Sequence, residues 1–257
     1  MAKKLYILSS GAGGTSYMTQ EALNALAECE VVVGYRNYVK ELAELLEDKV
    51  VSMSGMTKEL ARCQEAIAYA KNGQTTCIVS NGDVNVFGLA TLIVEQIDEQ
   101  GLWDEIELIS VAGVTSFLAT ASRVGAPISQ DFAVISLSDK VNSRQVIDKR
   151  VRNCFEADMI LGIYNPKSRK HQLCYEDFLV TMQKGEERIA VIASHVGQKN
   201  EKITITSTTD LVAQGMEHPE ITMSTLLIIG NSQTRLTSNG SVLTPRQYAT
   251  SRLSKVS

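Results

Sequence analysis

Proline, aromatic side chains and a net charge of either sign are all in short supply in this chain of 257 residues. It has four prolines, 5% of its residues are aromatic, and 25 basic residues face 29 acidic ones, for a formal charge of −4. Without a basic excess the chain has little with which to displace the counterions of a nucleic acid, and it has few rings for base stacking. We therefore expect no nucleic-acid partner.

The cysteines are few and stand singly. Five are present, with no C-x-x-C pair and an odd number overall. This pattern disfavours both a zinc site and a secreted disulfide framework, and it predicts buried thiols in a reducing compartment. We expect no metal centre.

Long apolar runs are missing as well. The N-terminal stretch Leu5–Leu8 offers four apolar residues before Ser9, too few for a signal peptide or a membrane span. Hydrophobic residues make up 44% of the chain and charged residues 21%, as in an ordinary globular protein with one or two domains. We expect a cytoplasmic protein that does not associate with membranes.

The first part of the chain alternates short apolar strands with helical patterns. This βαβα order predicts a largely parallel sheet covered by helices. The expected strands are 5–8, 31–33, 76–80 and 106–108. Three helices are expected: one that begins at Thr19, one that begins at Thr57 and one that spans 87–99.

The second part mixes strands and helices. Residues 203–206 alternate strictly between apolar and polar, which predicts a half-exposed antiparallel strand. We expect an α/β protein of two α/β domains, residues 1–113 and 114–257, with the active-site cleft between them. The further strands expected are 132–137, 159–164, 189–193 and 223–229, and the helices are 144–155, 172–182 and 209–214.

Three glycine-bearing loops follow apolar strands, namely 11–14, 81–83 and 112–113. Ligands of α/β sheets bind at the carboxyl ends of strands, where glycine lets the backbone approach closely. Each loop alone is typical of a tight turn, and Asp83 alone is typical of an Asx-turn. The three together favour a ligand site.

The usual nucleotide motifs do not fit these loops. A dinucleotide fingerprint needs a glycine where Ser16 stands and an acid after the second strand, where Gly34 and Tyr35 stand. A phosphate-binding P-loop is missing too, and there is no Gly-x-Ser-x-Gly elbow. No catalytic residue is identified.

Several longer segments carry a resemblance that runs essentially end to end. Together with the glycine loops, they make the chain similar to the tetrapyrrole (corrin/porphyrin) methylase superfamily. Within it the chain most resembles the C17-methyltransferases that act on precorrin-3B or cobalt-factor III. The most diagnostic segments are 131–139 (DFAVISLSD), 164–168 (YNPKS), 230–234 (GNSQT) and 244–246 (TPR).

The resemblance implies a homodimeric enzyme of cobalamin biosynthesis. Its cofactor would be S-adenosylmethionine, released as S-adenosylhomocysteine, and its substrate a corrin precursor methylated at C17 with ring contraction. Two alternatives stay open: methylation at another position of the macrocycle, or a non-catalytic paralogue that binds the cofactor or a tetrapyrrole.

The resemblance also implies the site residues. Corrin precursors carry many carboxylates, so cations are expected among the substrate contacts. The cofactor-binding residues implied are Ala12, Asn81, Gly82, Asp83, Val86, Phe87, Thr115, Ser116, Tyr164, Asn165, His195 and Val196. The substrate-binding residues implied are Gly11, Gly13, Gly14, Lys167 and Arg169.

The chain departs from the family's usual loops at three positions. Ala12, Val84 and Ala112 stand where most members have proline. Restoring proline at Ala12 and Val84 is expected to improve cofactor affinity by roughly 0.4–1 kcal/mol. This holds only if neither amide N–H donates a hydrogen bond, because proline has no such donor.

Overall fold

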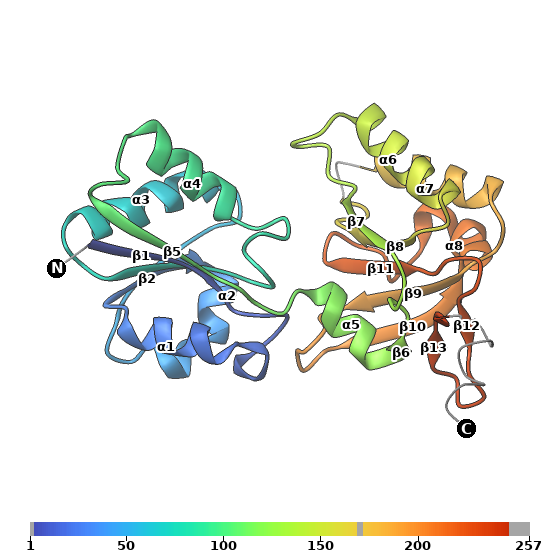
Figure 1. Ribbon diagram of the computed structural model, residues 1–257, viewed down its shortest axis with the longest axis horizontal. Helices are drawn as coiled ribbons and strands as arrows, with labels where there is room; N and C mark the ends of the chain where they lie inside the picture. The colour runs from blue at the N-terminus through green and yellow to red at the C-terminus, as the bar shows by residue number, and fades with distance from the viewer. Residues whose placement is uncertain (1–2, 169–171, 247–257) are drawn as a thin grey trace, which may run out of the picture. The chain divides into compact units, whose positions relative to one another are not determined.

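The computed structural model describes residues 3–168 and 172–246 and divides into two compact units. One runs to Ala119 and also includes Val196–Lys199, and the other runs from Thr120 to His195 and resumes at Asn200. In Figure 1 the first unit is blue to green and the second is green to red. No helix in the described ranges is long and apolar enough to cross a membrane.

The sheet of the first unit, predicted to be largely parallel, is parallel throughout. Its strand order is β3-β2-β4-β1-β5, and every neighbouring pair runs in the same direction. All five carboxyl ends therefore lie along one edge. The strands are β1 (Lys3–Ser9), β2 (Val31–Tyr35), β3 (Val50–Ser54), β4 (Thr76–Ser80) and β5 (Ile106–Val111).

Helices cover both faces of this sheet because successive side chains of a strand point to opposite sides. Leu5 and Ile7 of β1 pack with α3 and α4 on one face. Tyr6 and Leu8 pack with α1 and α2 on the other, and Figure 1 shows these two layers. Burial on both faces explains the continuous apolar runs. The helices are α1 (Gln20–Glu28), α2 (Arg36–Glu41), α3 (Glu59–Lys71) and α4 (Ala90–Glu99), with short 3-10 turns η1 (Thr15–Tyr17) and η2 (Ala43–Leu45).

The predicted start of α1 is confirmed. Thr19 is its N-cap, and the Thr19 hydroxyl accepts a hydrogen bond of 3.1 Å from the N–H of Ala22. The helix buries Ala22, Ala25 and Leu26 against the sheet. The helix α4 begins three residues later than predicted because residues 81–89 form a loop at the end of β4.

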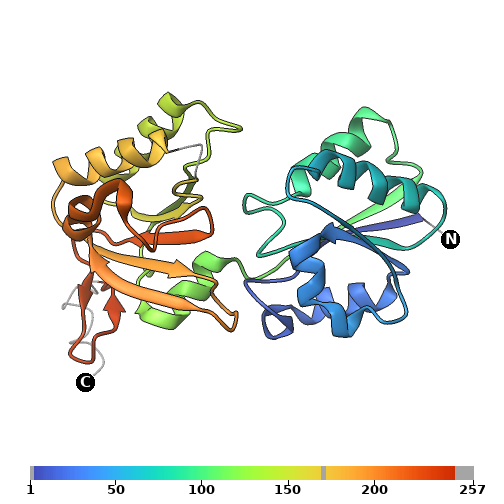
Figure 2. The same cartoon turned by 180° about the vertical axis from the view of Figure 1, so that it is seen from behind.

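The second unit has a mixed five-stranded sheet of order β10-β9-β11-β8-β7. β7 and β8 are parallel, and the other neighbours are antiparallel. The strand predicted at 203–206 is confirmed as the edge strand β10, and Figure 2 shows it beside β9. The strands are β7 (Phe132–Ser136), β8 (Ile160–Tyr164), β9 (Ile189–Ser194), β10 (Lys202–Ser207) and β11 (Thr225–Ile229).

Three helices bury one face of this second sheet, and their apolar residues join those of the strands in a single core. They are α6 (Arg144–Glu156), α7 (Leu173–Lys184) and α8 (Thr208–Gln214), followed by η3 (Gly215–Glu217). Sequence analysis assigned no element to α5 (Ser116–Val124) or to the small sheet of β6 (Gly125–Ala126), β12 (Arg235–Leu236) and β13 (Val242–Leu243).

Candidate functional site

The three glycine-bearing loops lie together at the carboxyl edge of the first sheet. They follow β1, β4 and β5, and β1 lies between the other two strands. Two backbone hydrogen bonds join the first two loops: the Gly11 N–H donates to the Gly82 carbonyl at 3.1 Å, and the Gly82 N–H donates to the Gly11 carbonyl at 2.7 Å. All three loops thus follow neighbouring strands at one edge of the sheet; that they bind a ligand stays a prediction.

Backbone conformation favours glycine at Gly11 and Gly82. Their φ angles are +75° and +70°, in the left-handed region that glycine adopts readily. A Cβ on Gly11 would lie 2.3 Å from the Tyr17 carbonyl oxygen, so packing also excludes a larger residue there.

Asp83 ties the second and third loops together. One carboxylate oxygen accepts from the N–H of Asn85 at 2.8 Å, which makes an Asx-turn, and the other accepts from the N–H of Gly113 at 2.8 Å. Gly113 itself comes close to the neighbouring loops, because a Cβ there would lie 2.4 Å from both the Gly82 carbonyl oxygen and the Cβ of Ser9. Both oxygens of Asp83 thus hold backbone of this edge.

The expectation that proline would fit at Val84 is wrong. The N–H of Val84 donates a buried hydrogen bond of 3.0 Å to the hydroxyl of Ser9, and both residues are fully buried. Proline would remove this donor and leave the hydroxyl without it. The Ser9 side chain at the end of β1 therefore holds the loop after β4 in place. A proline at this position would instead restrict the loop through its rigid ring.

The loops leave open backbone where a flat or extended ligand could approach. A Cβ on Gly82 would meet only Thr115 within 4 Å, with the Thr115 hydroxyl oxygen at 3.7 Å. Gly14, with φ +63°, has no neighbouring atom within 4 Å of that position. Backbone groups beside a threonine hydroxyl suit the amino-acid and ribose portions of S-adenosylmethionine, so the residues fit the implied cofactor.

Gly13 and Val196, both predicted site residues, lie close together. A Cβ on Gly13 would lie 2.9 Å from the Val196 carbonyl oxygen and 2.8 Å from the carbonyl carbon of Gly197. Ala12 and Val196 are themselves buried. At Gly13 the close approach is to protein backbone, whereas Gly14 faces open space.

Three predicted residues of the second unit lie at the carboxyl ends of two strands: Tyr164 and Asn165 at β8, and His195 at β9, with β11 between these strands. The Asn165 side-chain amide donates to the Ser136 hydroxyl at 3.0 Å, and the Leu137 N–H donates to the Tyr164 carbonyl at 2.9 Å. Asn165 and His195 have φ angles of +50° and +53°. Such strain in non-glycine residues costs about 1–3 kcal/mol and clusters at functional sites.

One more predicted site residue, Phe87, has a positive φ. Phe87 has φ +56° and is 53% exposed, so a bulky ring is held out from the loop after β4 in an unfavourable conformation. Among the described non-glycine residues with positive φ, Asp158 is the one that was not predicted. Its carboxylate accepts from the N–H and hydroxyl of Ser232 and pairs with Arg188, which gives it a structural role.

The predicted substrate cations have different outcomes. The Lys167 ammonium donates to the Met216 carbonyl and, at 3.5 Å, to the His218 carbonyl, and it lies 5.9 Å from the centre of the Tyr175 ring. In this structure the ammonium therefore binds its own unit. Arg169 lies outside the described residues. Substrate contact by either stays a prediction.

Sequence analysis assigned no role to Arg62 of α3, which is 3% exposed. Its Nε donates to the Ser54 hydroxyl at 2.9 Å and its Nη2 donates to the Gly55 carbonyl at 2.7 Å. Arg62 lies at i−4 from Ala66 on the buried face of α3, and this helical spacing could have drawn attention to it.

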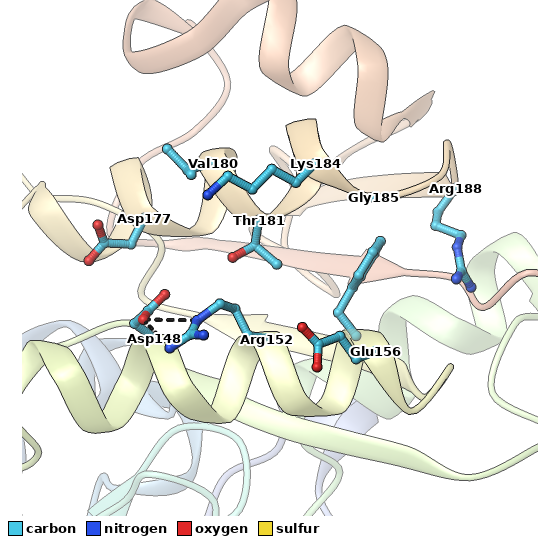
Figure 3. Close-up of a pocket in the computed structure, with 10 residues that line it drawn as sticks. Asp148, Arg152, Glu156, Asp177, Val180, Thr181, Lys184, Gly185 and Arg188 are labelled. Atoms are coloured by element: carbon cyan, nitrogen blue, oxygen red, sulfur yellow. Dashed lines mark hydrogen bonds and ion pairs between the residues drawn. The ribbon is translucent and has the colours of Figure 1, made fainter.

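A cavity of about 500 Å³ lies elsewhere, between α6 and α7 (Figure 3). Several of its charged side chains are already paired: Arg152 with Asp148 at 2.9 Å along α6, and Asp177 with Arg144 at 2.5 Å. None of the predicted site residues lines it. In the described part of the chain, no three His, Cys, Asp or Glu side chains are placed to hold a metal ion.

The fold and these loops define an α/β protein whose candidate site is lined by backbone at the carboxyl edge of a parallel sheet. The model of the tetrapyrrole (corrin/porphyrin) methylases matches residues 4–212. The chain belongs to this family, and the resemblance stated from sequence is confirmed.

Named relatives resemble the chain over nearly its whole length. It is 36% identical to the "Probable cobalt-factor III C(17)-methyltransferase" of Salmonella typhimurium, over 95% of this chain and 99% of the relative. It is 34% identical to the "Precorrin-3B C(17)-methyltransferase" of Sinorhizobium sp, over 97% of this chain and 98% of the relative.

Solved structures share the fold. The methyltransferase CobJ superposes with a TM-score of 0.86 at 28% identity, covering 94% of this chain and 99% of that one. The uroporphyrin-III C-methyl transferase of Thermus thermophilus, complexed with S-adenosyl homocysteine, superposes with a TM-score of 0.68 at 18% identity. The superposition covers 88% of this chain and 97% of that one. The predicted fold class is confirmed.

Proposed function

We propose that this protein transfers a methyl group from S-adenosylmethionine to C17 of cobalt-factor III or precorrin-3B in cobalamin biosynthesis, with contraction of the ring. The observation that carries the proposal is the end-to-end similarity, at 34–36% identity, to relatives named for these two reactions. The superposition on the methyltransferase CobJ supports it, as does a protein of the same fold that holds S-adenosylhomocysteine.

The cofactor, when bound, supplies an electrophilic methyl group on a sulfonium. We assign its binding to the residues that the resemblance indicated, with the loops after β1, β4 and β5 of the first unit as the core of the site. Gly82 contributes backbone that a ligand can approach, and Thr115 contributes a hydroxyl beside it. Asp83 acts indirectly, because its carboxylate holds two of these loops in register.

The chemistry asks little of side-chain nucleophiles. A methyl displacement needs the acceptor carbon and the methyl group held in line and away from water. Loops tied by the Gly11–Gly82 pair and by Asp83 are suited to holding a ligand in one geometry. The group that handles protons during ring contraction stays unassigned.

The test is incubation of the protein with methyl-labelled S-adenosylmethionine and either cobalt-factor III or precorrin-3B. We expect mass spectrometry to show one labelled methyl on the macrocycle with one of the two substrates, and NMR to place it at C17. A methyl at another position would replace this assignment by the first alternative. Binding of S-adenosylhomocysteine without turnover of either macrocycle would favour the non-catalytic paralogue.

On the resemblance we also propose a cytoplasmic homodimer with no nucleic-acid partner. Light scattering coupled to size-exclusion chromatography should give twice the mass of the 28.1 kDa chain. A monomer at micromolar concentration would contradict the dimer.

A further inference from the structure

The other half of the same sheet edge, at the ends of β2 and β3, carries a cluster of polar aromatic and basic side chains. Tyr35 ends β2 and Tyr38 follows in α2, and their rings meet edge to face with centroids 5.0 Å apart. The Arg62 guanidinium lies 5.9 Å from the centre of the Tyr35 ring. We call Tyr35, Tyr38 and Arg62 the tyrosine–arginine cluster.

Arg62 is placed at considerable cost. Its guanidinium is buried with neutral oxygens and a ring face as partners, and it forms no ion pair with any described carboxylate. It is the fourth residue of α3, so it also lies near the positive end of the helix dipole. Buried charges are ordinarily paired. Arg62 has neutral hydrogen-bond partners, although Glu41 and Glu59 also act on Tyr38, so the guanidinium can still attract an anion from outside the chain.

The tyrosine hydroxyls retain donors for such a partner. Tyr35 accepts a hydrogen bond of 3.1 Å from the Asn37 side chain. In the described ranges neither Tyr35 nor Tyr38 donates its own hydroxyl proton to a protein acceptor. Burial raises the pKa of the Tyr38 hydroxyl, so that hydroxyl stays a donor at neutral pH.

Exposed apolar side chains adjoin the cluster. Met56, two residues beyond the Ser54 that Arg62 holds, is 60% exposed, and Leu60 of α3 is 51% exposed. Gly55, between Ser54 and Met56, has no atom within 4 Å of where its Cβ would lie. This surface suits the apolar face of a ring whose rim carries anions.

We propose that the tyrosine–arginine cluster binds a peripheral carboxylate of the macrocyclic substrate, with the hydroxyls of Tyr35 and Tyr38 as donors. Arg62 is a positioning residue: it holds Ser54, Gly55 and the Tyr35 ring in place and supplies positive potential. The proposal rests on the proposed function, since it assumes a carboxylate-bearing tetrapyrrole. It extends the substrate contacts from the Gly11–Gly14 loop after β1 to the ends of β2 and β3, beside the cofactor loops after β4 and β5.

The test compares Tyr35→Phe and Tyr38→Phe with Tyr69→Phe, which removes a hydroxyl from a half-buried tyrosine near the other end of α3. Loss of a hydrogen bond to a charged group corresponds to a roughly 10- to 100-fold weaker interaction. We expect KM for cobalt-factor III or precorrin-3B, and the dissociation constant of the macrocycle with S-adenosylhomocysteine present, to rise by about this factor for the cluster variants. Affinity for S-adenosylhomocysteine itself should not change, nor should either constant in Tyr69→Phe.

Two further measurements separate positioning from mere folding. Fully methyl-esterified cobalt-factor III should bind the wild type weakly, and Tyr38→Phe should discriminate less between the acid and its ester. Arg62→Lys should raise KM more than it lowers kcat, while Arg62→Met, if folded, should show the larger rise. Unchanged macrocycle affinity in both Tyr→Phe variants, in a wild type that methylates normally, would overturn the proposal. Failure of the wild type to bind any macrocycle would instead overturn the proposed function.

Discussion

The hydrogen bond between Ser9 and Val84 makes a sharp prediction about how the candidate site is held together. Ser9→Ala removes the acceptor and leaves the Val84 N–H buried without a partner, since both residues are 0% exposed. An unsatisfied buried donor costs about 1–3 kcal/mol, so the free energy of unfolding should fall by that amount. Urea unfolding with an unchanged m-value would measure it.

The neighbouring serine provides a matched control. The Ser10 hydroxyl donates to the Ser80 carbonyl at 3.2 Å, but that oxygen also accepts from the Ser10 N–H at 2.9 Å. Ser10→Ala therefore leaves no group unsatisfied, and it should cost about 0.5–1.5 kcal/mol at most. Ser9→Ala should be the more damaging of two chemically identical changes in adjacent, buried positions.

A double-mutant cycle isolates the bond itself. Val84→Pro removes the donor. Adding Ser9→Ala to that variant then leaves no buried donor without a partner, so the further loss of unfolding free energy should be close to zero. The coupling free energy should then equal the cost of Ser9→Ala alone, about 1–3 kcal/mol. Equal costs of Ser9→Ala in both backgrounds, or a cost no larger than that of Ser10→Ala, would refute the argument.

Three further outcomes are expected. Gly82→Ala and Gly101→Ala place a Cβ at φ +70° and +64°, so each should lose about 1 kcal/mol of stability, but calorimetry should show weaker S-adenosylhomocysteine binding only for Gly82→Ala. Asp83→Asn replaces one carboxylate oxygen by an NH2 group, which cannot accept the hydrogen bond that the Gly113 N–H donates. The free energy of unfolding and the affinity for S-adenosylhomocysteine should both fall. Unchanged values would mean that the hydrogen bond between Asp83 and Gly113 is dispensable. Burial lowers the pKa of His218, so the unfolded chain takes up its proton first as pH falls below about 6.5, and stability should decline there. In His218→Asn that decline should be smaller when urea unfolding is compared between pH 7.5 and 5.

Much of the first unit was predictable because its signals are local. The strands of a parallel sheet are buried on both faces, so β1, β2 and β4 stand out as short apolar runs. β3 was missed for the converse reason: it is an edge strand whose residues are all half-buried or exposed, and two of its five residues are serine. The glycine loops were found because a strand followed by glycine is visible in a window of ten residues.

The same sequence could not show what those loops do to one another. Asp83 was predicted as a site residue, but that its second oxygen holds the N–H of Gly113, 30 residues away, follows only from β1 lying between β4 and β5. Likewise Ser9 and Val84 are 75 residues apart, and their hydrogen bond reversed the expectation drawn from the missing proline. The only sequence signal at Arg62 was its helical spacing. Its partners Ser54, Gly55 and Tyr35 lie at the ends of β3 and β2, outside the helix that carries it.

What the sequence determined by itself was therefore the succession of strands and helices, the conformational freedom at the loops and, through its longer segments, the family. Those properties depend on neighbouring residues, whose steric and burial preferences act over a few positions of chain. Which loops meet, which amide is already a donor and which cation is left without a carboxylate depend on strand order. Strand order brings together groups that lie tens of residues apart in the chain, so these contacts are visible only in the folded protein.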